Sequence, residues 1–255
     1  MKTLSALVVC HNEEQQLADC LRLLRFADEI VVVLDRCTDK SAAIAAGFTD
    51  RLIAGAWEIE GQRRNVGLDA CKGDWIIEVD ADERLPPALA VEIRATIAAA
   101  TPGYFLVPFD NYVGERLVRY GWGGVWGVRA APRLSYRGAK RWGDQRIHPS
   151  LSLVGPKRFL TVPMVHYVDR NVSDMIQRLD RYTSARAADL RAKGDIGHLR
   201  SAIRRFFSRF IKCYFQDSGW REGIWGFVIA LMGGLYPLLS YLKARLDDPP
   251  APRSG

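Results

Sequence analysis

The rest of the sequence is organised around the stretch Gly73-Asp74-Trp75-Ile76-Ile77-Glu78-Val79-Asp80-Ala81-Asp82-Glu83. Its apolar, β-branched segment predicts a strand buried in a sheet. Three carboxylates, Asp80, Asp82 and Glu83, come at the C-terminal end of that strand. Ligands bind at the carboxyl ends of strands in an open α/β sheet, and two aspartates one residue apart can both reach a divalent cation. The alternative is an acidic turn that caps a helix beginning near Pro86.

The sequence before this stretch alternates short apolar runs with helical patterns. Strands are predicted over 4–10, 29–34 and 51–53, and helices are predicted after Asn12, over 41–46 and over 60–71. This alternation predicts a parallel sheet with right-handed crossovers. Polar residues follow the strands: Asn12 and Glu13 after the first, and Asp35 after the second. Each could cap the next helix, as Asn12 could for the helix after it, but three clusters on one sheet edge favour a ligand site.

Two common classes of nucleotide-binding protein are disfavoured by missing motifs. A dehydrogenase would carry Gly-x-Gly-x-x-Gly after its first strand, and a P-loop enzyme would carry Gly-x4-Gly-Lys-[Ser/Thr]. The first strand is followed instead by Cys10-His11-Asn12-Glu13-Glu14. The five cysteines are scattered and never spaced as Cys-x-x-Cys, and the N-terminus lacks a signal-peptide pattern, so a cytosolic protein is expected.

The C-terminal part is predicted to be helical and to interact with a membrane. Apolar residues from Ile203 to Tyr214 recur at helical spacing, and basic residues fill the positions between them without an acidic residue from Arg200 to Lys212. A helix of this kind suits an anionic membrane surface, or equally a helix docked on the core with a solvated basic face. The net charge of +7 also favours anionic partners.

Residues 223–242 then run for 20 positions without a charge. That length could span a bilayer, but Gly233-Gly234 and Pro237 interrupt the run. We therefore expect a shallow or re-entrant membrane hairpin, with a full span and a buried core helix as the alternatives. The proline-rich tail is expected to be disordered.

The ordered motifs resemble those of the family 2 glycosyltransferases, which have a GT-A fold. They are the polar ends at Asn12-Glu13 and Asp35, the stretch Gly61-Gln62-Arg63-Arg64-Asn65-Val66-Gly67, and the stretch that ends in Asp80-Ala81-Asp82-Glu83. Together with Trp220 to Leu231 they are most similar to the bacterial lipopolysaccharide-core glucosyltransferase branch. The resemblance implies an α/β GT-A (Rossmann-like) domain over 1–170, with a nucleotide-binding half at 1–100 and an acceptor half at 101–170. A helical, membrane-associating region would follow over 171–246, and a disordered tail over 247–255.

The resemblance also implies roles for single residues. Those that would bind the nucleotide sugar are Asn12, Glu13, Asp35, Arg63, Arg64, Asn65 and Asp80. Asp80 and Asp82 match the Asp-x-Asp pair that holds Mg²⁺ or Mn²⁺ on the diphosphate, and His166 could complete the metal shell or be a core histidine. A cation and arginines are needed because charge develops on the leaving diphosphate.

Family 2 enzymes invert the anomeric centre, so one general base suffices. The branch places a glutamate where this chain has Pro149 in Trp142-Gly143-Asp144-Gln145-Arg146-Ile147-His148-Pro149. Asp144 is the nearest carboxylate and is the first candidate for the catalytic base. Glu83 is the second.

The function expected is transfer of a sugar from a nucleotide-sugar donor, a UDP-sugar, to a glycolipid or lipid-linked acceptor. It would take place on the cytoplasmic side of the inner membrane, with the protein peripheral or re-entrant and bound to an anionic membrane surface. No nucleic acid partner is expected. The alternatives are a sugar nucleotidyltransferase, which would carry a glycine-rich basic loop after its first strand, and a non-catalytic binding protein.

Overall fold

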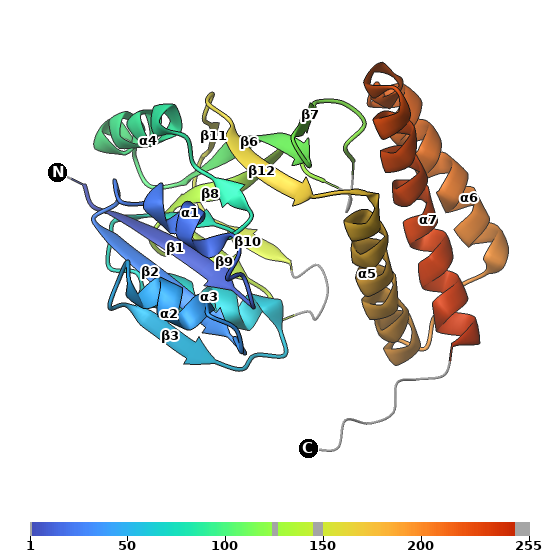
Figure 1. Cartoon of the computed structure of the whole chain (residues 1–255), viewed down its shortest axis with the longest axis horizontal. Coiled ribbons are helices and arrows are strands. Elements are labelled where there is room, and N and C mark those ends of the chain that lie inside the picture. The colour runs from blue at the N-terminus through green and yellow to red at the C-terminus, as the bar shows by residue number, and fades with distance from the viewer. Residues whose placement is uncertain (1, 124–126, 145–149, 248–255) are drawn as a thin grey trace. The chain divides into compact units, whose positions relative to one another are not determined.

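A mixed sheet organises the N-terminal part of the chain (Figure 1). The computed structural model describes residues 2–123, 127–144 and 150–247. Within these residues the sheet contains β1 Leu4–Cys10, β2 Glu29–Asp35, β3 Leu52–Gly55, β4 Trp75–Val79, β5 Glu83–Arg84, β6 Tyr104–Val113, β7 Arg116–Val118, β8 Ala130–Tyr136, β11 Lys157–Phe159 and β12 Met164–Asp169. Two further strands, β9 Lys140–Trp142 and β10 Leu151–Leu153, pair with each other as a separate antiparallel ribbon.

The strand order is β3-β2-β1-β4-β8-β6-β12-β5, and β7 and β11 both pair with β6. The first four strands are parallel, which confirms the parallel sheet predicted from their sequences. β8 pairs antiparallel with both β4 and β6. Because β2 and β3 lie on one side of β1 and β4 lies on the other, the strand order reverses between β1 and β4. Ligands bind in the crevice at such a switch point in open α/β sheets.

Both faces of the parallel strands are covered by helices, so both faces are apolar. The helices of this part are α1 Leu17–Arg22, α2 Ser41–Ala46, α3 Glu60–Ala70 and α4 Pro87–Ala99. Alternate residues point to opposite faces of a strand. Leu4, Ala6 and Val8 of β1 therefore pack with α1, α2 and α4, whereas Leu7 packs with α3.

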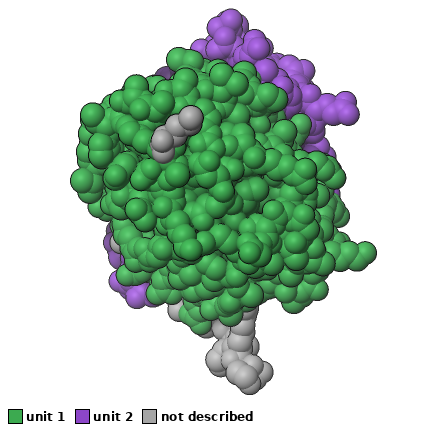
Figure 2. Space-filling model, turned by 90° about the vertical axis from the view of Figure 1, so that its left-hand side faces the viewer, with its two compact units in different colours: residues 1–110, 130–167 green, residues 111–129, 168–255 purple. Residues whose placement is uncertain are grey.

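Contacts divide the chain into two compact units, coloured separately in Figure 2. The first unit comprises 1–110 and 130–167 and holds most of the sheet. The second unit comprises 111–129 and 168–255. Its helices are α5 Val172–Ala192, α6 Leu199–Ile211 and α7 Ile224–Leu246, with a π-helical turn, η2 Lys212–Gln216, and a 3-10 turn, η3 Gly219–Glu222, between the last two. Its core joins α5 and α7 to the 113–122 segment through Val113, Trp122, Met175, Leu179, Ile229, Met232 and Tyr236.

The predicted membrane hairpin over 223–242 is wrong, because α7 continues without a break through Gly233, Gly234 and Pro237. The two glycines are buried and allow close packing: a Cβ on Gly234 would lie 2.9 Å from the backbone oxygen of Phe206 on α6. α7 is the one helix in the described residues that is long and apolar enough to cross a membrane, and 44% of its most apolar window is already buried within the protein. The predicted disordered tail lies outside the described residues apart from Asp247.

Two helix caps that the sequence allowed as alternatives are not formed. The acidic turn does not cap α4, which begins after Pro86 and has no acidic residue in its first turn. Asn12 does not cap α1, because that helix begins five residues later, at Leu17, after Gln16. Asn12 and the carboxylates of the acidic turn can therefore bind other groups.

Candidate active site

Asp80 ends β4 between two arginines. Its Oδ1 atom lies 3.1 Å from Nη1 of Arg64, which comes from α3, and its Oδ2 atom accepts a hydrogen bond from Arg133 of β8. Burial by itself would raise the pKa of Asp80, but the two guanidinium groups hold it well below its ordinary range. Both oxygens of Asp80 are thus occupied by arginine, and Asp80 stays charged.

Asp82, Glu83 and His166 form a group that could hold a metal ion. One ligand atom from each residue lies within 4.8 Å of those of the other two. β5 pairs antiparallel with β12 so that Glu83 is opposite His166, and this pairing brings the imidazole to the acidic turn. The Oδ1 atom of Asp82 is buried and has no hydrogen-bond partner in the described part of the chain. A buried carboxylate oxygen without a donor is costly, and a bound cation would satisfy it, so these residues fit Mg²⁺ or Mn²⁺.

The charges around this group leave an excess of negative charge at Asp82. Asp80 and Glu83 are both paired with Arg133, whereas the one cationic neighbour of Asp82 among the described residues is His166, at 3.5 Å. Glu13, which follows β1, is close enough to sense this charge, because burial and then repulsion from Asp82 raise its pKa. Burial opposes a charged His166, but the hydrogen bond and charge of Asp82 outweigh it and raise the pKa of the imidazole. A cation is therefore attracted to the Asp82 end of the cluster.

Glu83 is completely buried beneath the acidic turn. Its Oε2 atom accepts the backbone N–H of Asp80 at 2.9 Å, and its Oε1 atom accepts a hydrogen bond from Arg133. Burial raises the pKa of Glu83 to about 7, against the opposing charge of Arg133. These contacts fix the turn that carries Asp82, and they leave Glu83 less accessible to an acceptor than a carboxylate at the surface.

Asp35, at the end of β2, is buried and completely hydrogen-bonded. Arg63 of α3 donates to its Oδ2 atom at 2.8 Å, Arg36 donates to both oxygens at 3.1 Å, and the backbone N–H of Trp57 donates to Oδ1 at 3.0 Å. Burial favours the neutral acid, but these donors outweigh it and hold the pKa of Asp35 below its ordinary value. Asp35 and Arg63 thus present a rigid polar pair at the strand ends.

Asn12 and Asn65 each join two segments of the first unit. Asn12 has a left-handed backbone (φ 55°), and its side-chain oxygen accepts the backbone N–H of Thr38 at 2.8 Å, which ties the β1 end to the β2 end. The amide of Asn65 accepts the backbone N–H of Trp142 at 3.0 Å and donates to the carbonyl of Trp142 at 2.8 Å. Asn65 therefore fixes β9 against α3 through both ends of its amide.

A buried charged pair behind Asp80 was not found from the sequence. Lys140 of β9 forms an ion pair with Glu78 of β4, and both are at most 5% exposed. Trp142 donates to Glu78 at 3.2 Å and lies under the guanidinium of Arg64, 5.0 Å from ring centroid to Cζ. Glu78 could have indicated this pair, because a carboxylate inside a strand predicted to be buried requires a cationic partner.

Asp144 lies in a bend just after β9 and is exposed. None of the described residues forms a hydrogen bond or an ion pair with its carboxylate. The remainder of the stretch that carried the prediction of the base, 145–149, lies outside the described residues.

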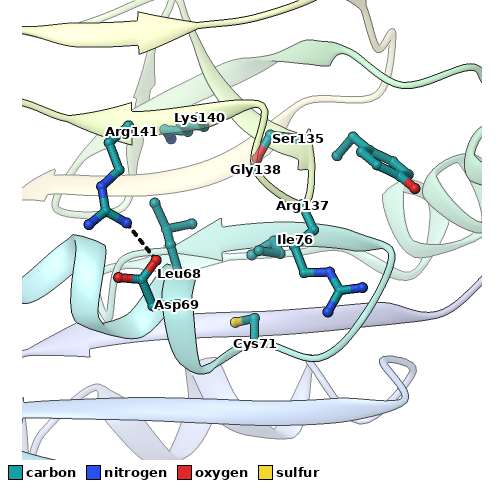
Figure 3. A pocket seen from close by; sticks show the side chains of 10 residues that line it. Leu68, Asp69, Cys71, Ile76, Ser135, Arg137, Gly138, Lys140 and Arg141 are labelled. Atoms are coloured by element: carbon teal, nitrogen blue, oxygen red, sulfur yellow. Dashed lines mark hydrogen bonds and ion pairs between the residues drawn. The ribbon is translucent and has the colours of Figure 1, made fainter.

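A cavity of about 420 Å³ lies in the first unit, and Lys140 is one of the residues that line it (Figure 3). It is lined by the end of α3, the start of β4 and the turn between β8 and β9, and the pair Arg141–Asp69 closes one side. None of the predicted site residues lines it. The predicted site residues therefore do not use this cavity, which meets the charged groups only at Lys140.

Comparisons with known proteins agree with this arrangement. The sequence model of the family described as glycosyl transferase family 2 matches residues 5–139, more than half of the chain. The lipopolysaccharide core biosynthesis glycosyltransferase LpsC of Rhizobium meliloti is 28% identical over 94% of this chain and 91% of its own length. An uncharacterized glycosyltransferase of Rickettsia typhi, RT0209, is 24% identical over 96% of this chain and 87% of its own.

Among solved structures, residues 1–349 of S. aureus TarS are similar with a TM-score of 0.50 and 16% identity, over 95% of this chain and 90% of that one. At this level of identity the likeness concerns the fold alone. The predicted GT-A-like α/β fold is confirmed by the sheet, its topology and this likeness.

Proposed function

The chain belongs to glycosyl transferase family 2 and is a glycosyltransferase, and from this premise we propose that it moves a sugar from a nucleotide-sugar donor, with inversion, to a glycolipid or lipid-linked acceptor. The observation that carries the proposal is the group Asp82–Glu83–His166 at the end of β4, with the buried, unpartnered Oδ1 atom of Asp82. This group lies beside the switch point of the sheet, where a nucleotide would bind.

The donor is held by the ends of β1 and β2 and by α3. Glu13 faces the nucleoside, and Asn12 fixes the loop that follows β2. The buried Asp35 acts by holding Arg63, which supplies positive charge there. Arg64, which is held by its ion pair with Asp80 at 3.1 Å, contacts the diphosphate. Asn65 acts through Trp142 as a positioning residue.

Asp82, with His166 and Glu83, would hold Mg²⁺ or Mn²⁺. When bound, the cation neutralises the charge that develops on the leaving nucleoside diphosphate. Arg133 forms ion pairs with both Asp80 and Glu83 and so holds the acidic turn in place. The ligand oxygens of the turn therefore do not have to move during catalysis. His166 is held by its strand pairing and by its ring contact with Phe109, 5.5 Å between centroids.

Asp144 is the general base in this proposal. It accepts the proton of the acceptor hydroxyl while the hydroxyl oxygen bonds to the anomeric carbon. The bond from that carbon to the diphosphate oxygen breaks, and its electron pair leaves with the nucleoside diphosphate. The exposed position of Asp144 suits this role, whereas Glu83 is buried and already accepts two hydrogen bonds.

The likeness to LpsC over nearly the whole chain supports an acceptor of the lipopolysaccharide core. With such an acceptor, the protein would work on the cytoplasmic side of the inner membrane. A UDP-sugar is the donor that we propose to test first.

The test is to incubate the protein with a series of UDP-sugars, a core glycolipid and Mn²⁺, and to measure released nucleotide. We expect release of UDP and a lengthened glycolipid. Asp144→Asn should lower kcat by about 10²- to 10⁴-fold with donor binding retained. Release of pyrophosphate would indicate a nucleotidyltransferase instead. If none of the donors raises the melting temperature in the presence of Mn²⁺, the proposal fails, because a bound ligand must stabilise the folded state.

A further inference from the structure

A stripe of exposed apolar side chains runs along α6 and into η2. It consists of Leu199, Ile203, Phe207, Ile211 and Phe215, and each of them is between 40% and 58% exposed. Residues four apart lie on one face of a helix, so the five side chains form a continuous row, which we call the α6 stripe. Contiguous apolar surface of this kind marks an interaction site on a soluble protein.

The α6 stripe continues onto the beginning of α7. The ring of Phe227 on α7 lies 5.7 Å from the ring of Phe210 and 6.2 Å from that of Tyr214. Phe227 is itself 45% exposed, and Ile224, one turn before it, is 77% exposed. Trp220, in η3 between the helices, is also exposed. The apolar surface therefore spans both helices and includes aromatic side chains of the kind found at membrane interfaces.

Cations border this surface. Arg200, Arg204, Arg205 and Lys212 are exposed, and none of the four forms an ion pair within the described residues. Two acidic residues that follow α6 already have cationic partners, since Asp217 pairs with Arg129 and Glu222 pairs with Arg116. Arg209 and Lys212 also line a cavity of about 190 Å³ beside Cys213. The surface of α6 thus carries a row of apolar side chains with positively charged side chains beside it.

α7 is not placed to cross a bilayer, although its length would allow it. Its buried side, Gly226, Ala230 and Gly233 among others, packs within the second unit. Near its end Lys243 binds the carboxylate of Asp180 and the hydroxyl of Ser184, and Arg191 donates to the carbonyl of Ala244 at 3.1 Å. A spanning helix would have to carry these polar partners into the hydrocarbon or lose them.

We propose that the α6 stripe and the beginning of α7 dock on an anionic lipid bilayer, with α6 lying in the plane of the interface. The apolar row enters the boundary between headgroups and acyl chains, and the arginines contact the anionic headgroups. A second copy of the chain is a poorer occupant. A two-fold contact through this face would place the same cluster of unpaired cations against itself. The inference extends the membrane location in the proposed function, but it concerns binding to lipid and not sugar transfer.

The experiment is flotation of the full-length protein with phosphatidylcholine vesicles, with and without phosphatidylglycerol, at low and high salt. We expect binding to the anionic vesicles that weakens as salt screens the charges. Phe207→Ser/Ile211→Ser should abolish binding. Arg200→Gln/Arg204→Gln/Arg205→Gln should weaken it by roughly a hundredfold, since each cation near an anionic surface contributes about a fivefold factor.

The matched control is Val91→Ser/Phe159→Ser, because these residues are 70% and 63% exposed but lie on α4 and β11. This variant should bind vesicles like the wild type, and circular dichroism should show that all variants are folded. Binding of the stripe variant at the wild-type level, or no preference for anionic vesicles, would overturn the proposal. The proposal would also be overturned if the wild type were a dimer and the stripe substitutions made it a monomer without changing its flotation. UDP release that depends on the donor is measured separately, without vesicles. It tests the proposed function, so that a failure of lipid binding can be distinguished from a failure of sugar transfer.

Discussion

The Oδ2 atom of Asp82 lies 3.5 Å from Nε2 of His166, although the two residues belong to segments far apart in the sequence. The short strand β5 brings them together, because it begins directly after Asp82 and pairs with the strand that carries His166. The contact joins the acidic turn after β4 to β12. A metal bound here would therefore hold the two parts of the sheet together as well as the substrate.

The first prediction concerns Asp82→Asn. We expect the variant to fold, because Asp82 lies in an acidic cluster and its Oδ1 atom has no hydrogen-bond partner in the described part of the chain. Mn²⁺ should raise the melting temperature of the wild type and not that of the variant. Sugar transfer should fall by about 10²-fold or more, since charge on the diphosphate is no longer neutralised. Asp19→Asn, which alters an exposed aspartate on α1, is the control and should respond to Mn²⁺ like the wild type.

The second prediction is a double-mutant cycle between Arg133 and Glu83. Arg133→Gln leaves the fully buried Glu83 without its cation, and loss of one partner of a buried pair costs about 3–5 kcal/mol. Because Arg133 opposes the rise in the pKa of Glu83, that pKa should increase further in the variant. Adding Glu83→Gln should restore part of the free energy of unfolding, with a coupling of roughly 1 kcal/mol or more in urea titrations. Strictly additive losses would show that the pair is not coupled.

The third prediction concerns the pH dependence of stability at Asp35. Its pKa is lowered in the folded protein, so its contribution to stability is present above the unfolded value of about 3.9 and is lost as the pH falls through the folded value. Asp35→Asn should lower the free energy of unfolding at pH 7 by on the order of 2 kcal/mol. The difference from the wild type should stay constant down to about pH 5 and shrink below about pH 4. A difference that grew in acid would contradict the assigned direction of the shift.

The parallel half of the fold could be predicted because local patterns determine it. The runs ending at Cys10, Asp35 and Val79 are apolar on both faces, and this pattern fits only strands covered on both sides. The position of His166 could be named only by resemblance, since it depends on the pairing of a two-residue strand. Arg133 and Lys140 were missed because their partners, Asp80 and Glu78, lie on other segments and no local pattern links them.

α7 was misjudged for a related reason. Gly233, Gly234 and Pro237 predict a break when the helix is considered alone. In the second unit the glycines instead permit close contact with α6, where a Cβ on Gly234 would meet the backbone of Phe206 at 2.9 Å. Tertiary packing thus outweighed the local preference of these residues.

The last prediction tests the link between α3 and the loop that carries Asp144. A Cβ on Gly61 of α3 would lie 2.0 Å from the carbonyl oxygen of Gly143, an atom that cannot rotate away. A glycine-to-alanine change inside a helix ordinarily stabilises by about 1 kcal/mol. Gly61→Ala should instead destabilise by roughly 1–3 kcal/mol, because the overpacked loop must shift.

That shift would move Asp144, the next residue, so kcat should also fall while Mn²⁺ binding at Asp82 is retained. Gly47→Ala is the matched control. Gly47 has an ordinary backbone (φ −73°), and its added Cβ would lie 3.3 Å from the carbonyl of Ile44. We expect it to leave kcat unchanged and the melting temperature equal or slightly higher. If Gly61→Ala behaved in the same way, the contact between α3 and the Gly143 loop would not position the catalytic base, and the role of Asp144 would have to be reassigned.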